Sequence, residues 1–383
     1  MLRVSRTNMG PIGDWWFTVD RYMLFGIVFL GLIGLFFSLA VSPVEASHLK
    51  TNQYFFLIKQ TIFLFISISL MVTISILPKS FSRKISLVLF IMSLLGVLLT
   101  LIIGFTSGGA SRWISVFGII TIQPSEFIKP CLIVISAWFF SRSKEENNST
   151  YSLIPGILFI FVALLLLLQP DLGQTILLFL TISCLIFIQG FPWLIIAPAG
   201  LLTMVVITFF YFNFSHFASR MDSWIEIWFG GGSINPKLTQ TKAAIDAIEN
   251  GQIFGKGIGE SWVKYHLPDA YTDFVFAAIA EENGLIVTIA LMLLYLMLIA
   301  RGLLRSMNQN NFFNQLASSG LIILFGLQTL IHIAVNLSLI PAKGMTLPFV
   351  SYGGSSLLAM GITMGMFLAL TRKSDENYSI KIT

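Results

Sequence analysis

Three carboxylates in the apolar stretch HLPDAYTDFVFAAIAEENGLI are the residues best suited to chemistry. Asp273 stands where the apolar run begins, and Glu281 and Glu282 follow a little over two helical turns later. A carboxylate that is partly withdrawn from water has a raised pKa, which lets it accept a proton from a hydroxyl group near neutral pH. Asp273 is therefore a candidate general base. The alternative is that Thr272 or Asp273 only caps the helix that starts here.

Other polar side chains gather in three short motifs between apolar runs. The motifs are SRWISVFGIITIQPSEFIK, QPDLG and NLSLIPAKGMTLPFVSYGGSS, and their candidate site residues are Arg112, Gln123, Glu126, Lys129, Asp171, Lys343, Ser351 and Ser355. A purely structural interpretation exists for several of them. Asp171 after Pro170 suits a helix cap, and a lysine or arginine at a membrane surface can extend to the lipid headgroups.

The elements that must position these residues are membrane-spanning helices. The chain of 383 residues is 56% hydrophobic and only 11% charged, where a soluble domain carries about a quarter charged residues. A helix needs roughly 20 apolar residues to cross a bilayer. We predict an all-α polytopic membrane protein that forms one domain over residues 1–383, with Cys131 and Cys184 inside spans and no disulfide. Its ten predicted spans are residues 22–42, 54–78, 85–105, 124–141, 153–169, 173–190, 192–213, 273–300, 314–338 and 350–371.

Lysine and arginine residues indicate the orientation of these spans, because both are enriched in cytoplasmic loops. Basic residues cluster in the tails 1–21 and 372–383 and in the turns on the same side, whereas the short loops on the other side offer only Lys50, Arg112 and Lys343. Both termini are therefore predicted to be cytoplasmic. The polar motifs then lie outside, which makes the extracytoplasmic face the working face.

The longest connection, residues 213–272 between the seventh and eighth predicted spans, lies on the same outer side. It contains Trp224, Trp228, the helix-like run QTKAAIDAIENG and glycines at 255, 257 and 259. Since aromatic residues anchor helices at headgroup depth, we expect short helices on the outer membrane face. The glycine triplet follows no predicted strand, so it indicates a tight turn rather than a phosphate-binding loop.

Taken in order, SRWI, QPSEFIK, QPDLG, GKGIG, LPDAYTDFVFAAIAEENGL and PAKGMTLPFVSYGGSS resemble the SEDS family (shape, elongation, division and sporulation), which includes FtsW, RodA and SpoVE. The resemblance runs from about Asp14 to Arg372 and is greatest to the FtsW branch, on WWFTVDRYML and HLPDAYTDF. It implies an inverting peptidoglycan glycosyltransferase of the bacterial inner membrane that polymerises lipid II into β-1,4 glycan strands at the division septum. The implied partners are lipid II, a class B penicillin-binding protein, other division proteins and membrane lipids, with no nucleic acid. A divalent cation, Mg²⁺ or Mn²⁺, is implied by the resemblance alone.

The resemblance also suggests roles for the polar residues. The family's essential aspartate matches Asp273, which would take the proton of the acceptor hydroxyl. Glu281 and Glu282 would lie at least partly within the membrane, with Lys129 as the expected partner of one of them; a purely structural ion pair is the alternative to a role in proton or cation handling. Arg112, Lys129 and Lys343 would neutralise the pyrophosphate, and the further substrate contacts would be Gln123, Glu126, Asp171, Ser351 and Ser355.

Three other functions stay open from the sequence. A transporter that flips lipid II should show inverted repeats and broken helices with polar groups near the bilayer midplane. No repeat is clear here and the polar groups crowd the outer face, which favours an enzyme. The sequence does not separate an FtsW-type from a RodA-type elongation role, nor from a non-catalytic division scaffold.

Overall fold

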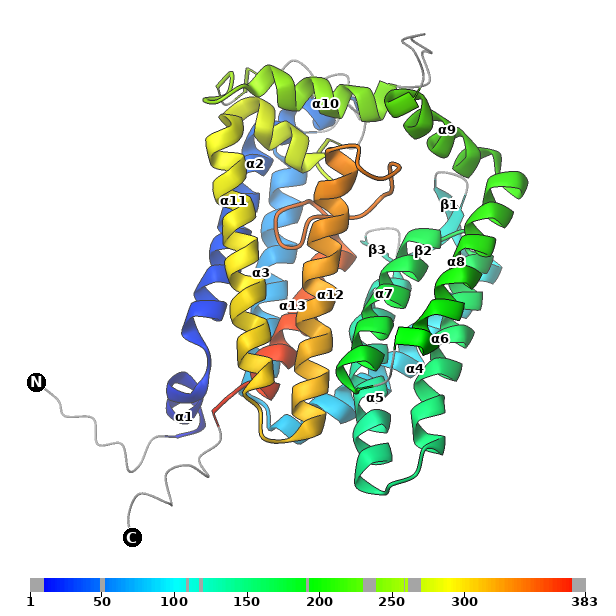
Figure 1. The fold of residues 1–383 in the computed structure, drawn as a ribbon. Helices are drawn as coiled ribbons and strands as arrows, with labels where there is room; N and C mark the ends of the chain where they lie inside the picture. Colours follow the sequence, from blue (N-terminus) through cyan, green and yellow to red (C-terminus); the bar gives the residue numbers. More distant parts are fainter. Residues whose placement is uncertain are drawn as a thin grey trace, which may run out of the picture.

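The computed structural model describes residues 10–48, 52–107, 110–116, 120–190, 193–229, 239–257, 259–260 and 270–373. Within these residues the chain forms a bundle of helices with one small sheet (Figure 1). The elements are α1 (Pro11–Thr18), α2 (Arg21–His48), α3 (Phe55–Ile76), α4 (Lys79–Ile103), β1 (Phe105–Ser107), β2 (Ala110–Val116), β3 (Ile120–Ile122), α5 (Pro124–Glu145), α6 (Thr150–Leu168), α7 (Leu172–Ile188), α8 (Trp193–Asn213), α9 (Ser215–Phe229), α10 (Thr239–Gly251), α11 (Val275–Met307), α12 (Phe312–Asn336) and α13 (Gly354–Leu370).

Each of the ten apolar runs predicted as a span is helical in the structure, from α2 to α8 and from α11 to α13. In the described part of the chain, α2, α3, α4, α6, α11 and α12 are long and apolar enough to cross a membrane. Shorter apolar helices are α7, α13 and the Thr203–Asn213 part of α8. The nearly all-helical polytopic fold is thereby confirmed, while a crossing by all ten helices stays a prediction.

Helix α13 forms much of the buried core and packs closely along α3. Two of its glycines, Gly361 and Gly365, have the GxxxG spacing that lets membrane helices approach. A Cβ atom at Gly361 would lie 2.5 Å from the carbonyl oxygen of Ser67, and one at Gly365 would lie 2.9 Å from that of Met71. The small residues of α13 therefore set the distance between these two helices.

A three-stranded antiparallel sheet in the order β1-β2-β3 joins α4 to α5. The prediction of an all-α chain did not include it. Its segments RWISV and ITI are rich in β-branched and aromatic residues, which favour strands. The sheet matters for the site because β2 carries Arg112 and β3 leads directly into Gln123 and α5.

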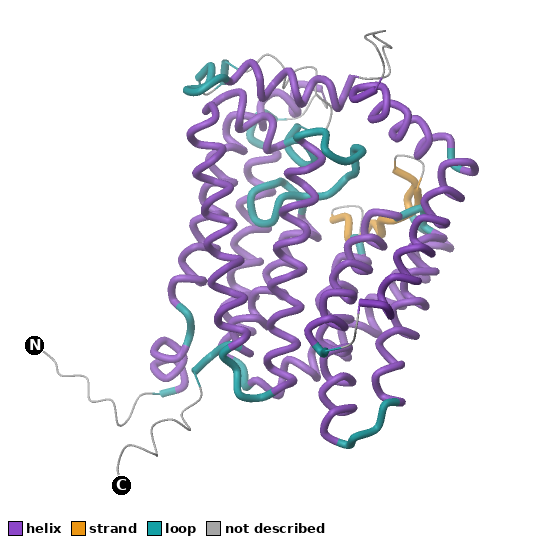
Figure 2. The backbone as a smooth tube through the Cα atoms, in the orientation of Figure 1, coloured by secondary structure: helices purple, strands orange, loops and turns teal. Residues whose placement is uncertain are grey.

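Helices α9 and α10 lie across one end of the bundle, as Figures 1 and 2 show. We call this the outer end; it also holds the loop 337–353 between α12 and α13. The indole N–H groups of Trp224 and Trp228 both donate to the carbonyl oxygen of Ser338, at 2.9 and 2.7 Å, and so tie α9 to that loop. Short helices within 213–272 are confirmed, and their contact with a membrane surface stays a prediction.

Helix α11 is divided at Gly284, where φ is 75° and ψ is −179°. Only glycine adopts this backbone conformation readily. Residues 275–283 form an outer segment ahead of the break. Residues 285–307 then continue as a helix that is long enough to cross a bilayer by itself, since roughly 20 residues suffice.

The turn that follows α10 docks onto this break. The backbone N–H groups of Lys256 and Gly257 donate to the carbonyl oxygens of Glu281 and Glu282, at 2.9 and 3.0 Å. Gly255 and Gly257 have φ values of 80° and 109°, so the tight turn expected from the glycine triplet is confirmed at these two positions. The outer segment of α11 is thereby fixed against α10.

The two ends of the described chain meet at the opposite end of the bundle. The backbone N–H of Lys373 donates to the carbonyl oxygen of Thr18 at 3.2 Å. Asp20, which is buried, pairs with Arg301 and Arg305 at 3.0 and 2.7 Å and ties the start of α2 to the end of α11. Both ends on one side are expected for an even number of spans, and the cytoplasmic assignment of that side stays a prediction.

Candidate active site

Asp273 lies just before α11, and its backbone is held by a neighbouring helix. The N-cap residue of α11 is Phe274, whose side chain has no hydrogen-bonding group. The N–H of Ala277 in the first turn donates instead to Oδ1 of Asn336 on α12 at 3.0 Å, and Nδ2 of Asn336 donates to the Asp273 carbonyl oxygen at 3.0 Å. Asn336 therefore supplies a side-chain acceptor to the first turn of α11 and holds the backbone of Asp273.

The loop 337–353 holds the residues that precede Asp273. The hydroxyl of Ser351 donates to the carbonyl oxygen of Thr272 at 2.7 Å. The backbone N–H of Tyr352 donates to the carbonyl oxygen of Tyr271 at 3.0 Å. The backbone around Asp273 is thus fixed from two sides, by α12 and by this loop.

A cavity of about 730 Å³ lies next to Asp273, between α7, α8, α9, α12 and the loop 337–353. Gly344 belongs to its lining, and Oδ2 of Asp273 lies 3.1 Å from the position that a Cβ atom of Gly344 would take. Much of the wall is apolar, with Ile176, Leu180, Ile207, Phe210, Phe214 and Leu330 among its residues. The site therefore combines an apolar chamber with an adjacent carboxylate.

The charged part of the lining comes from four separate elements. Arg112 on β2 lies 3.8 Å from the carboxylate of Asp171, and its Nε donates to the carbonyl oxygen of Gln169 at 3.2 Å. Asp171 is at the same time the N-cap of α7, which confirms its cap role, and it also lines the cavity, while its contact with substrate stays a prediction. Arg220 on α9 donates to the carbonyl oxygen of Ala342 at 3.3 Å. Together with Lys343, these residues place three cations and one carboxylate around the cavity.

Lys343 is the least compensated of these charges. Its Nζ atom is buried and makes no hydrogen bond to any described residue, and its aliphatic stem packs so closely on Gly173 that a side chain there would overlap it. Burial lowers the pKa of Lys343 to about 7; the charge of Asp171 opposes this shift, and those of Arg112 and Arg220 add to it. Because a buried cation without a partner is costly, the site is electrostatically prepared for an anion.

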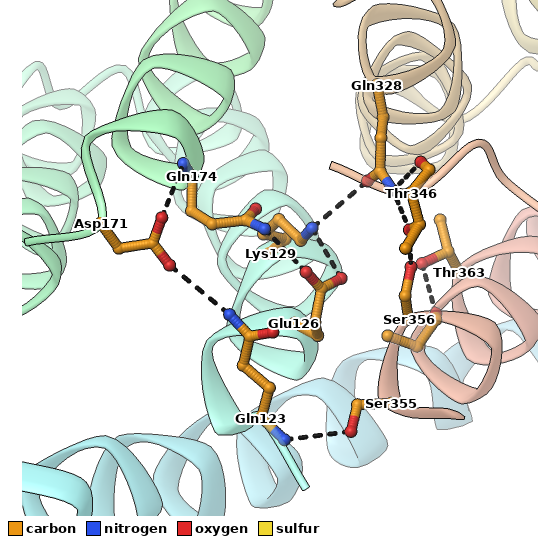
Figure 3. A network of polar contacts seen from close by, with 11 residues as sticks. Gln123, Glu126, Lys129, Asp171, Gln174, Gln328, Thr346, Ser355, Ser356 and Thr363 are labelled. Atoms are coloured by element: carbon orange, nitrogen blue, oxygen red, sulfur yellow. Dashed lines mark hydrogen bonds and ion pairs between the residues drawn. The ribbon is translucent and has the colours of Figure 1, made fainter. Parts of the chain in front are cut away.

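A buried polar network lies beside the cavity and connects α5, α7 and α12 to the loop 337–353 (Figure 3). Nζ of Lys129 lies 2.8 Å from Glu126 and donates to the side-chain oxygen of Gln328 at 3.2 Å. Nε2 of Gln174 donates to Glu126 at 2.7 Å, and Nε2 of Gln328 donates to the carbonyl oxygen of Thr346 at 3.1 Å. These bonds hold together the elements that frame the site.

Gln123 and Ser355 extend this network toward the cavity. The backbone N–H of Gln123 donates to the Ser355 hydroxyl at 3.0 Å, which joins the start of α5 to the start of α13. Its side-chain amide donates to Asp171 at 3.5 Å. The network and the charged lining therefore share Asp171.

Known proteins match the chain over nearly its whole length. Residues 21–376 fit the family model FTSW_RODA_SPOVE, described as cell cycle protein. The chain belongs to the FtsW/RodA/SpoVE family. Its relatives include proteins named probable peptidoglycan glycosyltransferase FtsW from Caulobacter vibrioides, 37% identical over 98% of this chain and 94% of the relative, and from Hydrogenovibrio crunogenus, 34% identical over 97% and 98%.

Solved structures share the fold of this FtsW/RodA/SpoVE protein. A chain from a peptidoglycan synthase complex, studied for the structural coordination of polymerization and crosslinking, has a TM-score of 0.73 at 25% identity and covers 93% of this chain and 98% of its own length. The rod shape determining protein RodA of Thermus thermophilus has a TM-score of 0.68 at 24% identity, over 93% and 97%.

The structure of this family member brings together only part of the predicted site. Arg112, Asp171 and Lys343 line the cavity and Asp273 lies beside it. The described lining does not include Gln123, Glu126, Lys129, Ser351 or Ser355, whose side chains or backbones bond to other parts of the protein. The predicted contacts of these five residues with substrate stay predictions, and their observed role is to hold the site in place.

One expected pairing is wrong. Lys129 pairs with Glu126 on its own helix and not with Glu281 or Glu282. Glu281 is fully buried, with its carboxylate 3.6 Å from Nζ of Lys256, which favours the structural ion pair for this residue. Both glutamates belong to the outer segment of α11, ahead of the break in the helix. The sequence pattern treated the helix as continuous from residue 273 and did not predict this break, and the depth of the two glutamates in the membrane stays a prediction.

The divalent cation implied by the family resemblance would need ligands from the residues of this site. In the described part of the chain, no three His, Cys, Asp or Glu side chains come close enough to form a metal site. Mg²⁺ can be held by one or two carboxylates together with substrate phosphates, so Asp273 would need substrate oxygens as additional ligands. The described residues do not form a cation site by themselves.

Two residues of the site were missed at the level of the sequence. Arg220 lies within the long outer connection, where its only signal is that it is a cation in an aromatic-rich helix. Asn336 is a polar residue at the end of an apolar run, and its fully buried amide gains its role from residues about 60 positions away. Neither role follows from local spacing.

Proposed function

We propose that the chain is a peptidoglycan glycosyltransferase that polymerises lipid II at the outer face of the cytoplasmic membrane, with Asp273 as the general base. The observation that carries this proposal is the combination of an apolar cavity, a cation cluster in which Nζ of Lys343 makes no hydrogen bond to a described residue, and a carboxylate at the cavity edge. A polyprenyl diphosphate has the matching parts, since it joins an apolar chain to an anionic headgroup.

In the proposed reaction, the acceptor hydroxyl oxygen attacks the anomeric carbon of the donor sugar. The bond from that carbon to the diphosphate oxygen breaks, and the diphosphate leaves with the electron pair. Asp273 takes the hydroxyl proton, so the attacking oxygen gains electron density as the new bond forms. Attack in line with the leaving group inverts the α-linkage of the donor to the β-linkage of the strand.

The cations of the cavity would act on the leaving group. Three separate elements, β2, α9 and the loop 337–353, supply Arg112, Arg220 and Lys343. The three cations already line one cavity in this structure. Fixed cations that face the oxygen on which charge develops stabilise the transition state more than they stabilise the ground state. The apolar residues of α7, α8 and α12 would hold the first units of the lipid chain.

The family relationship supports the finer assignments. The relatives named FtsW support a role in division at the septum in preference to the RodA-type role. The chain of similar fold from a peptidoglycan synthase complex supports a partner that crosslinks the strands, a class B penicillin-binding protein. The charged lining belongs to outer-end elements, which favours an enzyme over a transporter with a site at the bilayer midplane.

The substitution Asp273→Asn tests the proposal. It keeps the shape of the side chain and removes the base, so polymerisation by the purified chain with its partner should fall by at least about 10² to 10⁴-fold. Asp222→Asn is the matched control, because Asp222 lies at the same end of the bundle on α9 and bonds to Tyr211. Folding and partner binding should be normal in both variants. Strand synthesis by Asp273→Asn at near the wild-type rate would end the assignment.

A further inference from the structure

The charge of the cavity has a consequence for the product of the proposed reaction. The donor carries its diphosphate as a diester, with one ionisable oxygen on each phosphorus and two negative charges. When the bond to the sugar breaks, the electron pair stays on the diphosphate oxygen and the hydroxyl proton goes to Asp273. The terminal phosphate then has a second ionisable oxygen with a pKa of about 6, so the product carries about three negative charges at neutral pH.

The cavity is built to bind that extra charge. Among the described residues of the lining there are three cations, Arg112, Arg220 and Lys343, and one carboxylate, Asp171. Nζ of Lys343 makes no hydrogen bond to a described residue and can donate to a phosphate oxygen without losing a protein contact. A terminal oxygen with a full negative charge accepts a stronger hydrogen bond than the ester oxygen it replaces.

The proposed contacts with the lipid chain would be the same before and after the reaction. Phe210, Phe214 and Phe217 line the same cavity as the cations, and the polyprenyl chain is present in donor and product alike. The sugar leaves with the strand, whereas the chain and the diphosphate stay together. The product therefore keeps both of the contacts for which the cavity provides partners, and it gains one charge.

We infer that this cavity binds the polyprenyl diphosphate product more tightly than the diphosphate diester from which it forms, so that the chain is inhibited by its own leaving group. The inference rests on the proposed function.

Two matched ligands test the inference on the full chain in detergent. Farnesyl diphosphate and its terminal methyl ester share the chain and both phosphorus atoms and differ by one negative charge. Calorimetry should give a dissociation constant about 10-fold lower for farnesyl diphosphate, as expected for one added charge-assisted contact. Farnesyl diphosphate should also inhibit polymerisation in competition with lipid II. Equal affinities of the two ligands, or no inhibition at a saturating concentration, would overturn the inference.

Variants locate the effect. Lys343→Gln should remove most of the difference between the two ligands, and Arg220→Gln serves the same purpose if the first variant does not fold. Lys59→Gln is the control, since Lys59 lies near the start of α3, outside the cavity lining, with its ammonium over the ring of Phe55. An equal loss of discrimination in Lys59→Gln and Lys343→Gln would refute the site.

The binding measurement also separates this inference from the proposed function. If the chain discriminates between the two ligands but makes no strands, the proposed binding site stands and the proposed polymerase activity is refuted. If the chain makes strands but does not discriminate between the ligands, the polymerase activity stands and the inference is refuted.

Discussion

Asn336→Ala should release Asp273 from α12, one of the two elements that hold it. The substitution leaves the buried Ala277 N–H without its acceptor and removes the donor to the Asp273 carbonyl oxygen. A buried donor left unpaired costs about 1–3 kcal/mol, and a half-buried carbonyl that can recruit water costs less. We expect the free energy of unfolding to fall by about 2–4 kcal/mol. Polymerisation per folded molecule should slow by about 10- to 100-fold, because a displacement of about 1 Å can cost 10²-fold in rate.

A second asparagine cap provides the control for this measurement. Asn311 accepts from the N–H of Asn314 at 3.1 Å and caps α12 at the opposite end of the bundle. Asn311→Ala should cost about 1 kcal/mol and leave polymerisation unchanged. The assay is thermal unfolding in detergent together with the rate of strand synthesis, corrected for the folded fraction. If Asn336→Ala makes strands as fast as Asn311→Ala, then Asn336 does not position Asp273 and the reasoning fails.

Two further predictions concern protonation and orientation. The ammonium form of Lys343 is populated below its pKa of about 7 and lost above it, so affinity for the methyl ester of farnesyl diphosphate should fall as the pH rises through about 7. At a pH about one unit above 7, binding of this ligand should be accompanied by proton uptake, which calorimetry detects as a binding enthalpy that depends on the buffer. Proton uptake that persists in Lys343→Gln would assign the proton to another group. In a background with Cys131 and Cys184 replaced by alanine, Glu249→Cys on α10 should react with an impermeant thiol reagent on intact cells and Ser149→Cys before α6 should not; the opposite pattern would invert the predicted orientation.

The helical architecture was predictable because it depends on quantities that are local in the sequence. A run of apolar residues about as long as the bilayer is thick must form helix, since backbone groups in a hydrocarbon environment can bond only within their own segment. The ten predicted runs accordingly match helices of the structure. The run QTKAAIDAIENG, which was predicted to be helical, likewise forms α10. The short sheet around Arg112 escaped this reasoning because its strands are too brief to show a clear period.

The candidate base and two of its cations could also be chosen from the sequence. Asp273 is a carboxylate at the edge of an apolar run, where burial changes its chemistry, and Arg112 and Lys343 are rare cations in outer loops. The cost of burying charge makes such residues conspicuous in an apolar chain. These three residues could therefore be identified from the sequence, whereas the distances between them could not.

Only the tertiary structure decided which polar residues face the cavity and which hold the bundle together. Lys129 carries the same charge as Lys343, yet it is neutralised by Glu126 within α5 while Lys343 has no such partner among the described residues. The break at Gly284 separates Glu281 from the longer part of α11, which the apolar pattern alone did not predict. The sequence determines which residues are costly to bury, because that cost belongs to each side chain, whereas packing determines which of them find a partner, because a partner comes from another helix.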